Sequence, residues 1–226
     1  MGRAPALVGL LLALAVAVLI AISGPLLLFN PWFVSAEQAR HDVPGRLATS
    51  QAEVDRVTGA ILGDIWTGGD FTVSLRDDQP LLDPDERSHM RDVGSLVRLL
   101  GTLAVVSALV VLFGLLTLRH ERRRVGRLLL LSAGIVGCLA VVLAAIFAVA
   151  FDQAFLAFHR IFFPQGNFLF GPDSNLLRLF PEPFWFEAAL VAGLAIVVSA
   201  LVVTLVGWRL WRSPGVIASW TKPPLA

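Results

Sequence analysis

The sequence has one cysteine, no tyrosine and few charged residues. Of 226 residues, 15% are charged and 56% are hydrophobic, and the single cysteine is Cys138. One cysteine excludes a disulfide framework and a cysteine-based metal site. Such a low share of charge and such a high share of apolar residues exclude an ordinary soluble domain. The composition therefore predicts a membrane protein.

The sequence also lacks the short motifs that mark common catalytic sites. It contains no Gly-x-Ser-x-Gly elbow, no His-Glu-x-x-His, no Cys-x-x-Cys and no phosphate-binding glycine loop. Its basic clusters lie beside apolar stretches and have no interleaved aromatic residues, which argues against nucleic acid as a partner. None of these motifs competes with the histidines considered below.

Four long apolar stretches predict four transmembrane helices, because each exceeds the roughly 20 residues that cross a bilayer. They cover residues 4–29, 94–118, 128–151 and 184–208. The first stretch is long for the apolar region of a cleaved signal peptide, and no convincing small-x-small cleavage site precedes Ser23-Gly24-Pro25. We therefore interpret it as a retained span.

Basic residues predict how the chain crosses the membrane. The loop 119–127 carries five arginines, and Arg3 and the tail 209–226 fall on the same side of the predicted membrane. Short basic loops mark the cytoplasmic side. We therefore expect a single membrane domain over residues 1–226 with both termini in the cytoplasm, and we expect segments 30–93 and 152–183 to be extracytoplasmic.

The first extracytoplasmic segment predicts a small cap on the spans. Ser50 begins a capping box, and an amphipathic helix follows that ends near Gly68. Residues 71–75 alternate like a strand that Asp77-Asp78-Gln79-Pro80 ends. We expect an all-α integral membrane fold, with this cap between spans 1 and 2 and an interfacial loop between spans 3 and 4. The apolar stripe, which faces the membrane or the other helices, consists of Val54, Val57, Ile61, Leu62 and Ile65.

A polar helical turn carrying His89 lies directly before the second span. Asp83-Pro84 and Glu86 predict a helix start with a capping box. At about 100° per residue, Asp85, Glu86 and Asp92 fall within roughly 60° of His89 on one helical face. A histidine bracketed by carboxylates suits acid–base chemistry at a lipid headgroup. The alternative interpretation is that His89 only decorates the membrane interface.

A second histidine lies in an aromatic stretch beyond the third span. Residues 155–163 predict an interfacial helix in the outer leaflet, with His159 and Arg160 at headgroup depth. An aromatic belt with an incidental histidine is the alternative. Further on, Asp173 can cap a short helix over residues 174–180. The three phenylalanines on one side of the interfacial helix are Phe155, Phe158 and Phe162.

The predicted topology places these histidines on one side of the membrane. His89, His159 and His41 all lie outside the same face, whereas His120 lies on the other. Two histidines at one depth, flanked by carboxylates and aromatic residues, predict a single site at the outer leaflet.

At these residues the sequence resembles the bacterial lipoprotein intramolecular transacylases, the Lit family. The resemblance covers most of the chain, and the chain departs from the family pattern at Phe168, where a tryptophan is usual, and at Gly171, where an acid is usual. The segments that carry it are Ser88-His89-Met90-Arg91-Asp92-Val93, Phe158-His159-Arg160-Ile161-Phe162-Phe163, Asn167-Phe168-Leu169-Phe170 followed by Asp173, and Phe180-Pro181-Glu182-Pro183-Phe184-Trp185.

The resemblance implies an acyltransferase at the extracytoplasmic face of a bacterial cell membrane. Its substrate would be a diacylated lipoprotein, whose sn-2 acyl chain would move to the α-amine of the lipid-bearing cysteine to give a lyso-form lipoprotein. His89 and His159 would be the catalytic pair. We expect no cofactor and no metal. The residues that we expect to support the pair are Asp92, Glu86, Arg160 and Asp173.

The two histidines suit this chemistry. A histidine with a pKa of about 6.5 can take a proton from the attacking nitrogen, and a second imidazolium can give one to the departing glycerol oxygen. Both reacting groups belong to one substrate, so much of the entropy cost of bringing them together is already met. The residues leave open which histidine is the base and whether an acyl-enzyme forms.

Two other functions are compatible with the same residues. One is a metal-dependent membrane lipid hydrolase that uses His41, His89, His159 and nearby acids, since zinc accepts nitrogen and oxygen ligands. The other is a non-catalytic membrane scaffold or assembly factor, in which both histidines only line the interface.

Overall fold

The computed structural model describes residues 3–75 and 80–213, and every regular element within them is a helix. Four of these helices are long and apolar enough to cross a membrane, namely α1, α5, α6 and α9. The prediction of an all-α integral membrane fold with four transmembrane helices is confirmed. The helices are α1 (Arg3–Leu27), α2 (Pro31–Arg40), α3 (Val43–Arg46), α4 (Gln51–Thr67), α5 (Pro84–Thr117), α6 (Arg122–Val149), α7 (Phe151–Phe162), α8 (Asn175–Leu179) and α9 (Glu182–Arg212).

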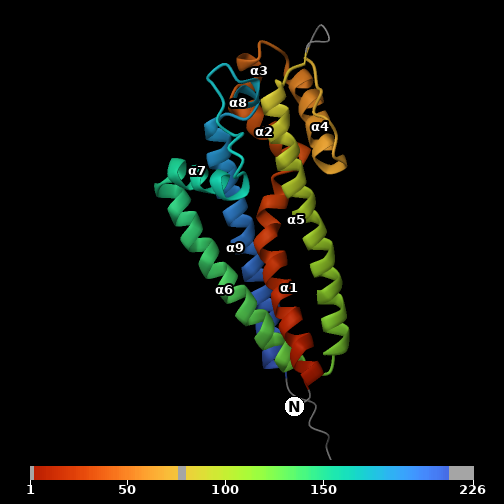
Figure 1. Ribbon diagram of the computed structural model, residues 1–226. Coiled ribbons are helices and arrows are strands. Elements are labelled where there is room, and N and C mark those ends of the chain that lie inside the picture. The colour runs from red at the N-terminus through yellow and green to blue at the C-terminus, as the bar shows by residue number, and fades with distance from the viewer. Residues whose placement is uncertain (1–2, 76–79, 214–226) are drawn as a thin grey trace, which may run out of the picture.

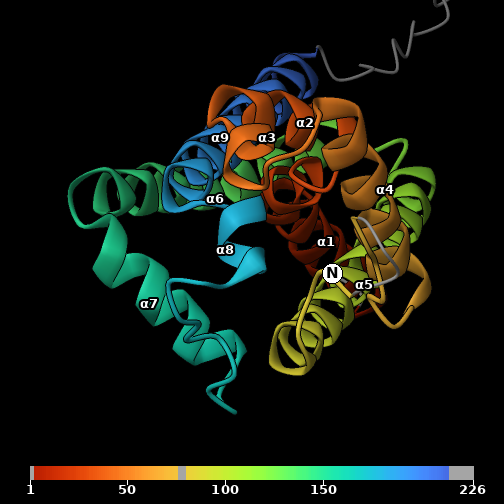
Figure 2. The same ribbon diagram turned by 90° about the horizontal axis from the view of Figure 1, so that it is seen from above.

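The long helices form a bundle, and the short helices gather at one end of it (Figure 1). Helices α2, α3, α4 and α8 lie over this end, while the start of α1 and the end of α9 lie at the opposite end. Viewed from above, α7 runs from the end of α6 toward the first turns of α5 (Figure 2). Two segments that lie far apart in the sequence therefore meet beside the cap.

Close backbone contacts and a hydroxyl hold the bundle together. Helix α6 packs against α9, and α1 packs against α5, α6 and α9. A Cβ atom on Gly126 would lie 2.5 Å from the backbone nitrogen of Trp211, so only glycine allows this approach of α6 to α9. The Ser132 hydroxyl donates to the Ala13 carbonyl at 2.8 Å, a polar contact that is satisfied between two apolar helices.

The cap has an apolar core of its own. The stripe on α4 is buried, and it packs with residues of α2, α5, α8 and α9 in one cluster. Ser50 caps α4 by accepting from the Glu53 amide, and Gly68, at φ 79°, ends the helix at the predicted position. Arg98 of α5 donates to the Ile65 carbonyl at 2.6 Å and so ties the end of α4 to α5. Of the two partners considered for the α4 stripe, the structure shows that it faces the other helices.

The predicted strand over residues 71–75 is wrong. Ser74 forms only an isolated bridge with Pro80, and Phe71 has a positive φ of 58°. The Phe71 amide donates to the Asp64 carboxylate, and its ring is buried in the cap core, so side-chain packing rather than strand pairing holds this segment. The residues expected to end the strand, 77–79, and the end of the tail, 214–226, lie outside the described residues.

Candidate active site

The helix that carries His89 begins as its sequence predicts. Asp83 accepts hydrogen bonds from the amides of Asp85 and Glu86, and the Glu86 carboxylate accepts from the Asp83 amide, which completes a capping box. Helix α5 then continues without a break into the apolar segment that starts at Gly94. His89 therefore lies on rigid helical backbone in the polar turns that precede the span.

His159 of α7 stacks on His89 of α5. The two ring centroids are 5.9 Å apart, with 24° between the ring planes. His89 is only 6% exposed, and Phe163 and Phe170 meet its ring edge-on at 4.8 Å and 5.6 Å. The structure thus brings together two histidines that are 70 positions apart in the sequence.

Aromatic rings surround His159 as well. The centroid of Phe155 lies 4.1 Å from that of His159, and the centroid of Phe168 lies 5.2 Å away. Phe158 and Phe163 approach the same imidazole at 5.4 Å and 5.6 Å. Both imidazoles therefore lie among apolar side chains on the same side of the bundle as the cap.

This environment favours the neutral forms of both histidines. The pKa of His89 is lowered to about 4, chiefly by burial and then by the neighbouring His159, against the opposing effects of Asp92 and Asn167. Burial also lowers the pKa of His159, which its hydrogen bond to the Phe155 carbonyl only partly offsets. At neutral pH both rings therefore have an unprotonated nitrogen available as a base.

The hydrogen bond of His159 determines which of its nitrogens is the base. Nδ1 lies 2.8 Å from the Phe155 carbonyl oxygen. A carbonyl oxygen only accepts, so Nδ1 is the donor and bears the proton. In the neutral ring the lone pair is then on Nε2. The backbone of α7 thus sets both the tautomer and the orientation of His159.

The loop after α7 is fastened to α5 by Asp92. The side-chain amides of Gln165 and Asn167 both donate to Oδ2 of Asp92, and the Asn167 contact measures 2.8 Å. Asn167 Nδ2 also lies 3.4 Å from the Ser88 hydroxyl. Asp92 therefore affects His89 through its charge and by holding the loop that covers it.

Glu86 fastens the other end of the same loop. This residue is 1% exposed, and Oε1 accepts from the Ser174 hydroxyl at 2.5 Å and from the Leu176 amide at 2.9 Å. Asn175 adds a hydrogen bond from its side chain to the Leu81 carbonyl. Two acids on one face of α5 thus hold the chain between α7 and α8 at both ends.

The remaining two predicted site residues lie at the surface. Arg160 is exposed on α7, next to His159 in the sequence. The side chain of Asp173 is fully exposed and lies 3.7 Å from Arg178. The predicted cap at Asp173 is wrong by one residue, because the Ser174 hydroxyl accepts from the Leu177 amide and α8 begins at Asn175. Asp173 has no contact with either histidine in the described residues.

Sequence reasoning missed the amides that hold the loop. Asn167 was noted only as part of a motif, and Gln165 was not noted, although both bond to Asp92. Oδ1 of Asn167 and Nδ1 of His89 are both buried and have no hydrogen-bond partner among residues 3–75 and 80–213. A polar Asn in an aromatic stretch was the available signal, because a buried amide needs partners.

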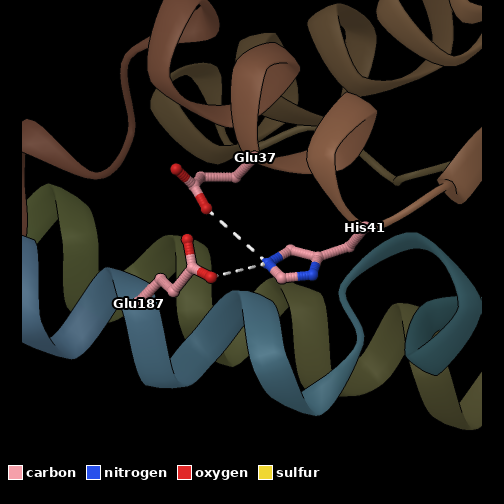
Figure 3. Close-up of side chains that lie close together, drawn as sticks. All are labelled: Glu37, His41 and Glu187. Atoms are coloured by element: carbon pink, nitrogen blue, oxygen red, sulfur yellow. Dashed lines mark ion pairs between the residues drawn. The ribbon is translucent and has the colours of Figure 1, made fainter.

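His41 does not join the other two histidines. It lies with Glu37 and Glu187, where α2 packs near the start of α9 (Figure 3). Within the described part of the chain this is the one group of three metal-ligating side chains, and it contains neither His89 nor His159. The three-histidine metal site of the hydrolase alternative is therefore not formed.

A cavity of about 590 Å³ is lined by Phe155 of α7, and neither His89 nor His159 is among its lining residues. The ring of Phe155 also contacts that of His159, with centroids 4.1 Å apart, so one aromatic ring links the cavity to this imidazole. Its volume falls in the range of pockets that hold small organic ligands. Aromatic and basic side chains share its wall, including Phe151, Phe180, Trp185, Arg46 and Arg178.

Comparisons with known proteins show the family and the fold of the chain. The family model described as "Lipoprotein intramolecular transacylase Lit" matches residues 8–185. The structure of the membrane integral lipoprotein intramolecular transacylase Lit from Bacillus cereus superimposes with a TM-score of 0.80 at 17% identity, covering 93% of this chain and 97% of that chain. No curated protein sequence matches significantly.

Two further structures of the Bacillus cereus protein carry a substitution of one histidine, by arginine or by alanine. Each matches with a TM-score of 0.73 at 17% identity and covers 92% of this chain. The shares of those chains that are covered are 92% and 94%. At this identity the likeness shows that the fold is shared.

Removing the Glu86 carboxylate is expected to loosen the site. Glu86→Ala leaves the Leu176 amide and the Ser174 hydroxyl without an acceptor, which we expect to cost about 2–4 kcal/mol in the free energy of unfolding. Asp85→Ala is the matched control, because this neighbouring side chain is exposed, and it should cost less than about 1 kcal/mol. Thermal unfolding in detergent measures both. Equal losses in the two variants would contradict a structural role for Glu86.

Proposed function

Since the chain belongs to the lipoprotein intramolecular transacylase Lit family and is an acyltransferase of that kind, we propose the atoms and residues of its reaction. The sn-2 acyl chain of a diacylglyceryl-cysteine lipoprotein moves to the α-amine of the same cysteine. His89 and His159 carry the proton transfers. The observation on which this proposal rests is the stacked pair of imidazoles, the buried His89 of α5 and the partly buried His159 of α7.

His159 is the better placed of the two to act as the base. Its Nδ1 is committed to the Phe155 carbonyl, so Nε2 has the lone pair that can take a proton from the attacking amine. The α-amine has an ordinary pKa of about 8, so the fraction that is protonated near neutrality first loses its extra proton to water. The neutral NH₂ nitrogen attacks the ester carbonyl carbon, and Nε2 of His159 takes one of its two protons as the C–N bond forms.

The reaction moves one proton from nitrogen to oxygen. The new C–N bond forms, the bond between the acyl carbon and the sn-2 oxygen breaks, and that oxygen leaves as a hydroxyl after it receives a proton. Each histidine opposes the charging of the other, since the proximity of His159 lowers the pKa of His89. The pair therefore carries at most one extra proton during the reaction, which the imidazolium returns to the leaving oxygen.

The supporting residues differ in how directly they affect this proton transfer. Asp92 favours the charged state of the pair by its negative charge and holds Asn167 beside His89. Glu86 acts only through the loop and α8. Arg160, exposed next to His159, meets the lipid carbonyl or headgroup region. Asp173 is too exposed to join them, and we assign it no part.

The cavity beside Phe155 is the candidate position for the lipid part of the substrate. Its apolar wall of Phe151, Phe180 and Trp185 suits an acyl chain, and its volume of about 590 Å³ is sufficient for a glyceryl group with a section of chain. Phe155 separates this cavity from His159 by one ring. An ester bound there would need only a short displacement to reach the imidazoles.

The orientation in the membrane follows from charge. We place the basic turn between α5 and α6, with Arg119 and the first residues of α6, Arg122 and Arg123, in the cytoplasm with both termini. The cap helices and α7 lie toward the other end of the bundle (Figure 1), and α7 carries His159, which stacks on His89. The active site is then at the extracytoplasmic face, where diacylated lipoproteins are anchored.

Replacing either histidine should abolish the transfer. We expect His89→Gln and His159→Gln each to lower the rate about 10²–10⁴-fold, and the double variant to lose little more, because the two act as a unit. The measurement is mass spectrometry of the N-terminal lipopeptide of a diacylated lipoprotein, in which one acyl chain moves to the amine at unchanged total mass. His120→Gln, on the opposite loop, is the control. Full activity in either single variant would refute the proposal.

The pH dependence of the reaction rate should reflect the lowered pKa of His159. The rate should fall first where the substrate amine, with its pKa of about 8, becomes protonated. Because burial lowers the pKa of His159, a second acid limb, from protonation of this base, should begin only below pH 6.5. Phe168→Ala admits water beside His159 and should move this limb upward. The substrate amine contributes the same limb to both enzymes, so the difference between them reports the histidine. An unchanged limb in Phe168→Ala would contradict this account.

Labelling of single cysteines tests the orientation. In a Cys138→Ser background, Ala36→Cys in the cap should react with a membrane-impermeant maleimide on intact cells. His120→Cys should react only after lysis. Both positions are exposed in the structure, so access depends on the side of the membrane. The reverse pattern would place the histidine pair in the cytoplasm and overturn the assignment.

A further inference from the structure

A second cluster of ligating side chains joins the cap to the fourth span. Glu37 and His41 lie one turn apart on α2, and Glu187 lies in the second turn of α9 (Figure 3). Nε2 of His41 is 3.7 Å from Oε2 of Glu37 and 3.4 Å from Oε1 of Glu187. One ligand atom from each residue lies within 4.8 Å of the other two.

The inner atoms of this cluster lack hydrogen-bond partners. Glu37 is only 5% exposed, and its Oε2 is buried without a partner among the described residues. Nε2 of His41 is buried and unpartnered in the same way. Figure 3 shows these atoms directed at one another and at Glu187. A buried carboxylate oxygen without a partner is costly, and two adjacent carboxylates repel each other.

The one arginine beside the cluster contacts its outer side. Arg40 bonds to Oε2 of Glu187 at 2.7 Å, and it lies 3.7 Å from Oε1 of Glu37. The second oxygen of each carboxylate faces His41 instead of Arg40. These oxygens are Oε1 of Glu187 and Oε2 of Glu37. Arg40 therefore orients both carboxylates and leaves the inner oxygens and the imidazole nitrogen directed at a common point.

The spacing of these three atoms suits a small metal ion. Zinc binds imidazole nitrogen and carboxylate oxygen at about 2.0–2.2 Å, so neighbouring ligand atoms of a tetrahedral site are roughly 3.3–3.5 Å apart. The distances of 3.4 Å and 3.7 Å are close to this. One nitrogen and two oxygen ligands favour Zn²⁺ over the all-oxygen shells of Ca²⁺ and Mg²⁺.

We propose that Glu37, His41 and Glu187 bind one Zn²⁺ ion, which fastens α2 of the cap to α9. The ion replaces an unfavourable contact between two carboxylates by two metal–oxygen bonds and one metal–nitrogen bond. Water completes the fourth position. Next to the site, Gln38 donates to the Leu179 carbonyl and accepts from the Thr58 hydroxyl, so α2 is already held in register with α8 and α4. The proposal is independent of the reaction at His89 and His159.

The test measures the thermal unfolding of the full chain in detergent, with any affinity tag removed and metal stripped by a chelator. Free Zn²⁺ at roughly 100 times its dissociation constant should raise the unfolding temperature by about 5–10 °C. Elemental analysis after dialysis should find one zinc per chain. Absence of both effects would overturn the proposal.

Variants locate the ion. His41→Gln and Glu187→Gln should lose the zinc-induced rise, whatever their own unfolding temperatures are. His120→Gln, which replaces an exposed histidine on another loop, should keep it. A rise that persists in His41→Gln and disappears in His159→Gln would place the ion at the histidine pair and refute the site.

Cobalt gives a second readout that does not depend on stability. Co²⁺ in a tetrahedral site of one imidazole and two carboxylates has intense visible absorption, and octahedral Co²⁺ in solution absorbs weakly. Wild-type protein should show the intense bands, and His41→Gln should not. Equal spectra for the two proteins would overturn the assignment of His41 as a ligand.

Discussion

One buried carboxylate holds three separate pieces of the chain together at the cap end of the bundle. Glu86 accepts hydrogen bonds from the Asp83 amide, the Ser174 hydroxyl and the Leu176 amide. A carboxylate that is 1% exposed is strongly unfavourable unless its oxygens are bonded. The start of α5, the end of the loop and the start of α8 must therefore form together. With Asp92 bonded to the other end of the loop, His89 is covered as a consequence.

The same covering determines how the histidines can act. Rings of phenylalanine surround both imidazoles, and removal from water favours their neutral forms. The stacking of the two rings penalises a second positive charge, so the pair readily takes up only one extra proton. A reaction that moves one proton from nitrogen to oxygen needs no more than this. A soluble enzyme would bury such histidines in a deep core. Here the loop between α7 and α8, together with α7 itself, covers them.

The sequence predicted the features that depend on nearby residues. The capping box at Asp83 and Glu86, the cap at Ser50 and the helix end at Gly68 all depend on residues three or four positions apart, and the structure contains each of them. The apolar stretches predicted four spanning helices for the same reason. The gathering of His89 and His159 followed from topology, because both were expected just outside one membrane face.

Features that depend on residues far apart in the sequence could not be predicted from local patterns. Ser174 and Asp173 are adjacent and both suit a helix cap, and the choice between them depends on Glu86, which is 88 positions from Ser174. The alternation at residues 71–75 resembles a strand, yet there is no neighbouring strand in the described residues, and the ring of Phe71 is buried instead. Glu37 and His41 are visibly one turn apart in the sequence, whereas Glu187 joins them only through the packing of α9.

Hydrolysis of the ester by water competes with acyl transfer. An activated ester beside a histidine base is also a substrate for hydrolysis, which would release the acyl chain instead of transferring it. The amine belongs to the same molecule as the ester, and well-oriented intramolecular groups reach effective concentrations of about 10⁵–10⁸ M, far above that of liquid water. This advantage is lost if the flexible link between the two groups is free to rotate. In the proposed reaction, the aromatic wall of Phe155, Phe163 and Phe168 would therefore favour transfer in two ways, by limiting water at the imidazoles and by restricting the positions that the lipid can occupy.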